Sequence, residues 1–253
     1  PPPPPPRPPP PPPPPRGAPD ATLAKAADLA SSGKREEAWA MLSDAWKAST
    51  DRAERKRLAE NLGVLGPAMA LSPEKLSISE IYVVQSGDAY EKIAKKFKIT
   101  HGLILRMNNR QGSRVDVGDR LKVIPGPPEL LVAKSEFILT LLIKGRFVKQ
   151  WIVGTGKFDK TPEGTFEIAT KKENPDWTFQ GRVIKFGDPE NILGTRWMGF
   201  KNTPEHKGYG IHGSVGGKGV GEEASNGCVR MRNEEVEELY PLVPYGTVVT
   251  IRR

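Results

Sequence analysis

YGIHGSVGGKGVGEEASNGCVRM, residues 209–231, holds the only cysteine of the chain, Cys228, and places His212 upstream of it across a glycine-rich loop. A thiol with a pKa of about 8.5 is mostly protonated at neutral pH, so a nucleophilic cysteine needs a base or a positive field. His212 provides that base if the loop folds back. The backbone N–H groups of Gly227 and Cys228 would then cradle the oxyanion that forms during attack.

A lone cysteine also has a simpler explanation, because most such residues are small buried hydrophobes. The presence of His212, Ser225 and Gly227 in register with Cys228 favours a nucleophile instead. Ser225 itself fits two roles equally well. It is either a turn hydroxyl bonded to nearby backbone or a group that acts directly in the reaction.

The order His212-Gly213, eleven residues, then Ser225-Asn226-Gly227-Cys228-Val-Arg-Met resembles the catalytic motif of the YkuD-type L,D-transpeptidases. The resemblance covers residues 128–253, and three further segments carry it: Thr161–Phe166, Asn191–Trp197 and Val243–Ile251. It departs at Asn226, where many members have a histidine. Because the base carried over is His212, this departure does not predict an inactive protein.

This resemblance implies a peptidoglycan L,D-transpeptidase. Cys228 would attack the carbonyl of the third stem-peptide residue, release D-alanine and form a thioester that an amine of a neighbouring stem accepts, giving a 3→3 cross-link. With water as the acceptor, the same site would be an L,D-carboxypeptidase. The other hypotheses are a non-catalytic wall-binding scaffold and an unrelated cysteine peptidase.

Four further residues are candidates for substrate binding. Tyr209, Gly213 and Trp197 lie where a stem-peptide groove is expected, although both aromatic rings could equally belong to the core. Arg230 either holds a substrate carboxylate or forms a structural ion pair. The sequence leaves that choice open, and the candidate carboxylates are Glu234, Glu235 and Glu237.

The sequence predicts neither a metal nor a cofactor. Three histidines and one cysteine without an HExxH spacing are too few ligands for a structural zinc site. His101 is expected at a helix start and His206 in a solvated loop. Residues 208–213 match G-x-G-x-x-G literally but do not open a helix after a strand, and residues 216–221 lack the G-K-[ST] ending of a P-loop.

Residues 81–126 resemble a LysM domain, which implies binding to glycans that contain N-acetylglucosamine. The resemblance rests on residues 82–88, on Ile93, Ala94, Phe97, Leu105, Asn108 and Asn109, and on residues 117–125. The pattern predicts a βααβ module. Asp88 is expected to cap the first of its two helices.

Residues 20–70 have helical periodicity and predict a small helical module, with helices over 36–48 and 51–65 after a first helix that ends at Gly33. Residues 33–42 resemble one tetratricopeptide-like hairpin, which is a possible surface for a protein partner. The positions expected to face inward are Leu23, Ala26, Ala27, Ala30, Ala38, Met41, Leu42, Trp46, Ala53, Leu58, Leu62 and Leu65.

Two segments are expected to be connections. Residues 1–19 are rich in proline, which favours an extended polyproline II spacer; a proline-rich ligand for another domain is the alternative. Residues 71–80 are expected to form a linker between the helical module and the LysM domain.

Residues 128–253 predict a mostly β catalytic domain, which the resemblance implies to be a β-sandwich. A hairpin is expected from 137–143 and 146–153, with more strands near 164–169, 182–186 and 247–252. One helix is expected near 233–242. The whole chain is therefore predicted to be an α+β multidomain protein.

The formal net charge of +8 predicts an anionic environment. A cell-wall polymer fits better than nucleic acid, because no basic recognition helix or aromatic-basic motif is present. No run of about 18 apolar residues occurs that would span a membrane. Because the chain begins with Pro1 rather than methionine, we expect a further N-terminal part, for which a signal peptide or a membrane anchor is one possibility. The resemblance to cell-wall enzymes implies that the protein is exported to the cell envelope.

Overall fold

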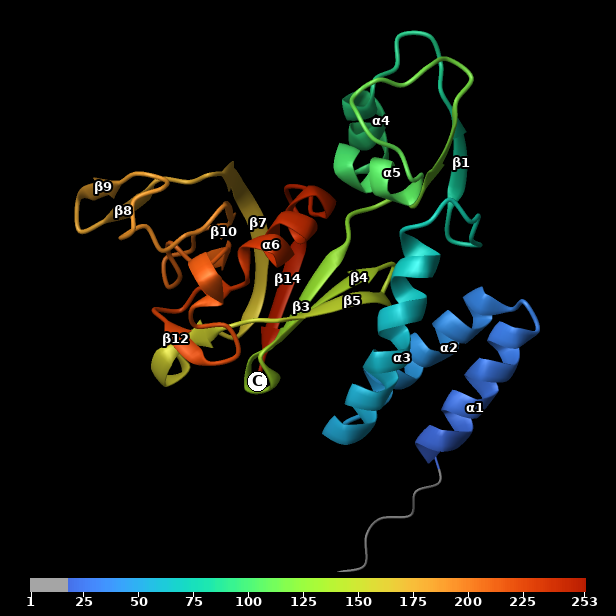
Figure 1. Cartoon of the computed structure of the whole chain (residues 1–253), viewed down its shortest axis with the longest axis horizontal. Helices are drawn as coiled ribbons and strands as arrows, with labels where there is room; N and C mark the ends of the chain where they lie inside the picture. Colours follow the sequence, from blue (N-terminus) through green and yellow to red (C-terminus); the bar gives the residue numbers. More distant parts are fainter. Residues whose placement is uncertain (1–17) are drawn as a thin grey trace, which may run out of the picture.

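The computed structural model describes residues 18–253 and shows three parts that share one hydrophobic core (Figure 1). They are an N-terminal helical module, a small β–α–α–β unit and a larger, mostly β domain. The predicted spacer, residues 1–19, lies almost wholly outside the described residues. In the described part of the chain, no helix is both long enough and apolar enough to cross a membrane.

The helical module consists of α1 (Ala18–Ser31), α2 (Arg35–Ala48) and α3 (Arg52–Ala70). The side chain of Asp51 accepts a hydrogen bond from the Glu54 amide and caps α3, which continues five residues past the predicted end. The inward face of α3 differs from the prediction at its start. Ala53 is exposed and Arg55 is buried in its place.

Residues 71–80 connect α3 to the small unit, and some of their side chains are buried. Leu71 and Leu76 are buried, and the buried hydroxyl of Ser79 donates to the Leu76 carbonyl and accepts from the Leu76 amide. This turn connects α3 directly to the next unit. The connection is therefore part of the core, which the polar composition of the segment did not indicate.

The small unit has the predicted βααβ order, with β1 (Glu80–Val83), α4 (Tyr90–Phe97), α5 (His101–Met107) and β2 (Arg120–Val123). Its two strands pair antiparallel. The predicted role of Asp88 is wrong: the N-cap of α4 is Ala89, and the Asp88 carboxylate instead accepts from the Tyr82 hydroxyl and the Gln85 amide. It therefore closes the turn before the helix.

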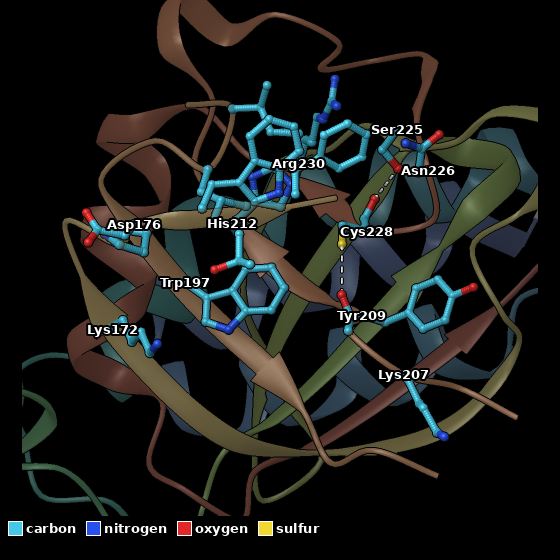
Figure 2. Close-up of a pocket in the computed structure, with 17 residues that line it drawn as sticks. Lys172, Asp176, Trp197, Lys207, Tyr209, His212, Ser225, Asn226, Cys228 and Arg230 are labelled. Atoms are coloured by element: carbon cyan, nitrogen blue, oxygen red, sulfur yellow. Dashed lines mark hydrogen bonds between the residues drawn. The ribbon is translucent and has the colours of Figure 1, made fainter. Parts of the chain in front are cut away.

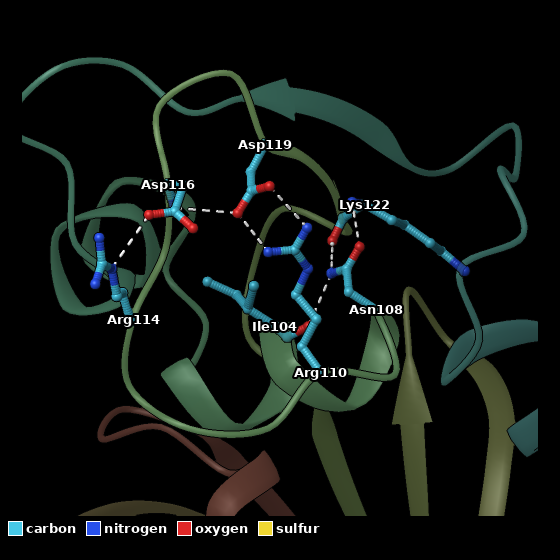
Figure 3. Close-up of polar contacts among 7 residues, drawn as sticks. All are labelled: Ile104, Asn108, Arg110, Arg114, Asp116, Asp119 and Lys122. Carbon is cyan, nitrogen blue, oxygen red and sulfur yellow. Dashed lines mark hydrogen bonds and ion pairs between the residues drawn. The ribbon is translucent and has the colours of Figure 1, made fainter.

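Polar side chains hold the second half of this unit together (Figure 3). The Asn108 amide donates to the carbonyls of Ile104 and Lys122, and its oxygen accepts from the Lys122 amide at 2.7 Å. Arg110 forms a two-point ion pair with Asp119. Asn108 thus joins α5 to β2, which gives this residue of the LysM pattern a structural role.

The larger domain is built on a curled sheet of eight strands. Across the sheet, the order is β13 (Val229–Arg230), β11 (Gly210–His212), β10 (Arg196–Phe200), β7 (Gly164–Glu173), β14 (Val248–Arg252), β3 (Glu129–Ala133), β4 (Ile138–Ile143) and β5 (Arg146–Ile152). The pairs β11–β13 and β14–β3 are parallel.

Shorter elements surround this sheet. Two minor sheets pair β6 (Thr155–Gly156) with β12 (Glu223–Ser225) and β8 (Trp177–Phe179) with β9 (Arg182–Ile184). The helix α6 (Asn233–Leu239) follows β13 and continues into a 3-10 turn to Leu242. The predicted hairpin is present as β4 and β5. Strands β3, β6, β8, β10, β11, β12 and β13 were not predicted; none of them is longer than five residues.

The helical module covers the open edge of this sheet. Strand β5 pairs only with β4, which leaves backbone groups of Phe147 without a strand partner. The indole of Trp39 donates to the Phe147 carbonyl at 2.6 Å, and the Phe147 amide donates to the Ser43 hydroxyl at 3.2 Å. Helix α2 therefore protects an edge that could otherwise pair with another chain.

Candidate active site

The parallel pair β11–β13 brings the predicted base and nucleophile to one side of the sheet. Ile211 pairs with Val229 and His212 with Arg230, so Cys228 lies beside the start of β11. Because side chains alternate along a strand, Cys228, His212 and Arg230 share a face. With about 4.8 Å between strands and about 6.6 Å for two residues along one, the backbones of Cys228 and His212 are roughly 8 Å apart. Both side chains line one pocket (Figure 2).

A hydrogen-bonded turn presents Cys228. The buried Ser225 hydroxyl donates to the Cys228 carbonyl at 2.7 Å and accepts from the Gly227 amide at 2.9 Å. Gly227 has φ +126°, and a Cβ there would lie 2.2 Å from the ring of Tyr209. Only glycine fits both the conformation and the contact.

This turn alters the expected oxyanion cradle. The Gly227 N–H is already bonded to Ser225, so it is not free to receive an oxyanion as the sequence suggested. Of the two roles considered for Ser225, the hydrogen bonds favour the turn hydroxyl, because the side chain bonds to the backbone on both sides of the turn. The Cys228 N–H remains the predicted donor of the pair.

The thiol of Cys228 is half-buried and donates to the Gly208 carbonyl at 3.7 Å. Burial raises the pKa of this thiol, while the Gly210 N–H and the charge of Arg230 oppose that rise. The resting group is therefore a thiol at neutral pH. A base must remove its proton before or during attack.

His212 is almost fully buried and is oriented from two sides. Its Nδ1 lies 2.6 Å from the Gly213 carbonyl, and because a carbonyl only accepts, Nδ1 carries the proton and Nε2 is the nitrogen that could act as a base. The backbone of Leu193 also contacts the imidazole and, like the Gly213 carbonyl, opposes the lowering of its pKa. Its ring lies 6.0 Å from that of Trp197, its partner across the β10–β11 pair. Burial lowers the pKa of His212 to about 4, so the imidazole is neutral at pH 7.

Arg230 supplies a positive charge to the pocket. It is half-buried, its Nε has no hydrogen-bond partner among the described residues, and the ion pairs found in residues 18–253 do not include it. The structural ion pair with Glu234, Glu235 or Glu237 is therefore not formed. Of these three, Glu237 instead lies 4.0 Å from Arg196.

The pocket has a volume of about 480 Å³ and extends from Cys228 to the β8–β9 hairpin. Its lining includes residues that the sequence analysis missed: Lys172, Pro175, Asp176, Trp177, Thr178, Phe179, Ile192, Leu193 and Lys207. The buried Asn191 holds the base of the hairpin, since its amide donates to the carbonyls of Pro175 and Ile184. Polar loops of this kind carry no periodic signal from which their position could be predicted.

Comparisons with known proteins agree with this arrangement. The family model of the L,D-transpeptidase catalytic domain matches residues 127–251, and that of the LysM domain matches residues 82–123. YqjB of Bacillus subtilis (strain 168), a candidate L,D-transpeptidase by name, is 41% identical over 131 residues, which are 51% of this chain and 73% of YqjB. The chain belongs to the YkuD family of L,D-transpeptidases.

Other relatives extend the comparison. YkuD of the same Bacillus subtilis strain is 32% identical over 180 residues, which are 68% of this chain and 98% of YkuD. A crystal structure of an L,D-transpeptidase from Xylanimonas cellulosilytica superposes with a TM-score of 0.40 at 21% identity, covering 50% of this chain and 61% of that one. Residues 18–70 lie outside both family matches.

The L,D-transpeptidase domain gathers most of the predicted site residues around one pocket. These are Trp197, Tyr209, His212, Ser225, Asn226, Cys228 and Arg230. Gly213 and Gly227 contribute through backbone and close packing rather than by lining it. A Cβ on Gly213 would lie 2.3 Å from the Asn233 side chain, so this glycine allows α6 to approach.

The other two histidines of this family member lie apart from Cys228. His101 begins α5 as predicted, and its ring stacks on Tyr90. His206 is half-buried rather than fully solvated, with its ring 5.6 Å from that of Phe166. Within residues 18–253, no group of three or more His, Cys, Asp and Glu side chains is arranged to hold a metal ion.

Proposed function

We propose that this chain is a cysteine-dependent peptidoglycan L,D-transpeptidase with Cys228 as its nucleophile and His212 as its base. The observation that supports this most is the pairing of β11 with β13. It places a half-buried thiol and a neutral imidazole on one face of the sheet and in one pocket, with Nδ1 of the imidazole held by the Gly213 carbonyl. Arg230 adds the positive field that favours a thiolate.

The proposed reaction has two stages. Cys228 Sγ bonds to the carbonyl carbon of the third stem residue while His212 Nε2 takes the thiol proton. The bond to D-alanine then breaks, and His212 returns the proton to the leaving amine. In the second stage an acceptor amine attacks the thioester, the carbon–sulfur bond breaks and the thiol regains a proton. An amine of a second stem gives a 3→3 cross-link, whereas water gives a carboxypeptidase.

The charge of the pocket supports a substrate that carries carboxylates. Lys172, Lys207 and Arg230 line it, and its one acidic side chain, Asp176, is paired with Lys185 at 2.8 Å. A peptide stem ends in a carboxylate, and arginine binds carboxylates well through its planar donors. Trp177 and Phe179, which stack on each other 4.8 Å apart, would cover the peptide from the hairpin.

The LysM domain implies that the protein acts on the cell wall. We propose that residues 81–126 bind the glycan and keep residues 128–253 near their stem peptides, which places the protein in the cell envelope. The LysM unit is fixed to the other parts. Lys122 donates to the Met69 and Ser72 carbonyls at 2.9 Å, and Thr100 donates to the Pro241 carbonyl. A rigid unit would present the pocket at a set distance from the glycan.

The test is product analysis with a disaccharide tetrapeptide. The wild type is expected to release D-alanine and to form cross-linked dimer, and Cys228→Ala is expected to do neither. Tripeptide without dimer would make the protein a carboxypeptidase. A folded wild type that releases no D-alanine would refute the enzyme and favour a wall-binding scaffold.

A further inference from the structure

A second cleft lies outside the catalytic pocket, between α3 and the sheet edge formed by β4 and β5, which are side by side in Figure 1. Its volume is about 650 Å³. Helix α3 contributes Arg55 and Lys56, and the facing wall contains Phe137 and Ile152. Because α3 lies outside both family matches, neither of these matches accounts for this cleft.

Arg55 is a charged side chain that is buried in this cleft without an ion pair. It is 8% exposed, and its guanidinium carbon lies 4.7 Å from the centre of the Trp46 ring. Its Nε has no hydrogen-bond partner, and none of the ion pairs found in residues 18–253 involves it. Burial and the charge of Arg252 lower the pKa of Arg55, and the charge of Glu136 opposes this only in part. An incoming anion would therefore reduce a cost of burial that is already present.

The other charges of the cleft indicate what kind of anion it accepts. Arg52 and Lys56 are exposed at its rim, while Glu60 and Glu136 line it and are also without ion pairs in the described part of the chain. Two free carboxylates would repel a polyphosphate. They suit a peptide, which carries an ammonium group as well as a carboxylate, and the Phe137 ring offers an apolar wall.

Gly63 lines this cleft without being required by packing inside the protein. It lies in the middle of α3, where glycine costs about 1 kcal/mol relative to alanine, and a Cβ there would meet no atom within 4 Å. Packing inside the protein therefore does not explain the glycine. A ligand that occupies the cleft would explain it, since Gly63 is part of the lining.

We propose that this cleft binds a peptide through its free carboxylate, with the Arg55 guanidinium as the two-point partner. The cleft reaches Ile152 and Gly221, and Gly154, two residues beyond Ile152, bridges to Arg230 in the catalytic pocket. The segment from Ile152 to Gly154 therefore connects the cleft to the catalytic domain's pocket. That this peptide is a second peptidoglycan stem rests on the proposed function.

The proposal is tested by ¹H–¹⁵N NMR on the full chain, which follows the Nε–H resonance of Arg55. This resonance is assigned by its absence in the spectrum of Arg55→Met. The probes are a disaccharide tripeptide, the same compound with amidated carboxylates, and inorganic phosphate. The tripeptide is expected to shift the resonance and the amidated form to leave it unchanged. Isothermal titration calorimetry measures the affinity of the wild type and of each variant, because the variants of Arg55 lack this resonance. Loss of a charge-assisted pair is expected to weaken the affinity of Arg55→Met for the tripeptide about tenfold or more.

Two further variants control for folding. Arg57→Met removes an exposed arginine of the same helix and is expected to bind like the wild type. Arg55→Lys keeps the charge but loses the planar fork, and is expected to bind with intermediate affinity. Equal affinity of all three variants and the wild type would overturn the proposal, as would a shift with phosphate but not with the tripeptide.

D-Alanine release by the same preparation separates the two proposals. Release without any shift of the Arg55 resonance would overturn the cleft and leave the enzyme. A shift without release would overturn the enzyme and leave a peptide-binding cleft.

Discussion

The imidazole of His212 is buried against Trp197, and this burial governs how the site responds to pH. The pKa of His212 is lowered from its ordinary 6.5 to about 4, so Nε2 stays able to accept a proton throughout mildly acidic conditions. We expect the imidazole resonance of His212, assigned by its loss in His212→Ala, to titrate near pH 4. A midpoint near 6.5 would contradict the buried, neutral base.

The same shift has a consequence for stability. Between pH 6.5 and about 4 the unfolded chain binds a proton at His212 that the folded chain refuses. The free energy of unfolding is therefore expected to fall as pH drops through this window. The fall should be smaller in His212→Gln, as measured by urea unfolding at several pH values; an unchanged pH dependence in this variant would assign the loss to other groups.

Ser225 is expected to be a positioning residue for the thiol. Ser225→Ala leaves the Gly227 amide and the Cys228 carbonyl without their partner, which costs about 1–3 kcal/mol of stability. Without these two hydrogen bonds the turn that carries Cys228 is held less firmly. We therefore expect kcat for D-alanine release to fall at least tenfold, while KM changes little.

Ser79→Ala is the matched control, because that buried hydroxyl makes the same pair of bonds to Leu76 in a turn away from the pocket. It should lose comparable stability and keep its kcat. If both variants lost the same fraction of activity, the effect of Ser225 would be stability alone.

The sequence pointed to the proposed nucleophile and base, but it indicated little of the residues that surround them. Cys228 and His212 lie in a short segment whose chemistry is legible from residue type and spacing. Arg55 gave no such signal, since a charged residue on a helix is ordinarily solvated and only the position of Trp46 and the sheet edge buries it. Tertiary contacts of this kind cannot be read from local pattern.

Alanine substitutions at two glycines of α3 are expected to change the stability of the protein in opposite directions. Gly63→Ala adds a Cβ in open space and should stabilise the protein by about 0.5–1 kcal/mol. Gly66→Ala would place its Cβ 2.4 Å from the Val148 carbonyl oxygen of β5 and should destabilise it by about 1–3 kcal/mol. Thermal and urea unfolding check both; the same sign for the two variants would contradict the packing of α3 on β5.

Elements with strong local patterns were predicted and the others were missed. The β4–β5 hairpin has a long apolar run and a Lys-Gly turn, and its boundaries were predicted to within one residue. Strand β11 has only three residues in a glycine-rich stretch and becomes a strand because β10 and β13 flank it. Its existence depends on segments distant in sequence.

At the scale of the whole molecule, the helical module is expected to be part of the L,D-transpeptidase fold rather than a separate docking domain. Ser43→Ala removes the acceptor of the Phe147 amide and Trp39→Phe removes the donor to its carbonyl. Each should destabilise the protein by about 1–3 kcal/mol. Hydrogen exchange at the Phe147 amide should accelerate in Ser43→Ala; unchanged exchange would mean that α2 does not protect this edge.

The covalent step is the measurement that we would make first. The wild type and Cys228→Ala are mixed with a disaccharide tetrapeptide, quenched in acid and weighed intact by mass spectrometry. We expect the wild type alone to gain the mass of the donor less D-alanine, and proteolytic digestion of the adduct to place this mass on the peptide that contains Cys228. An adduct on both proteins, or D-alanine release by Cys228→Ala, would show that Cys228 is not the nucleophile.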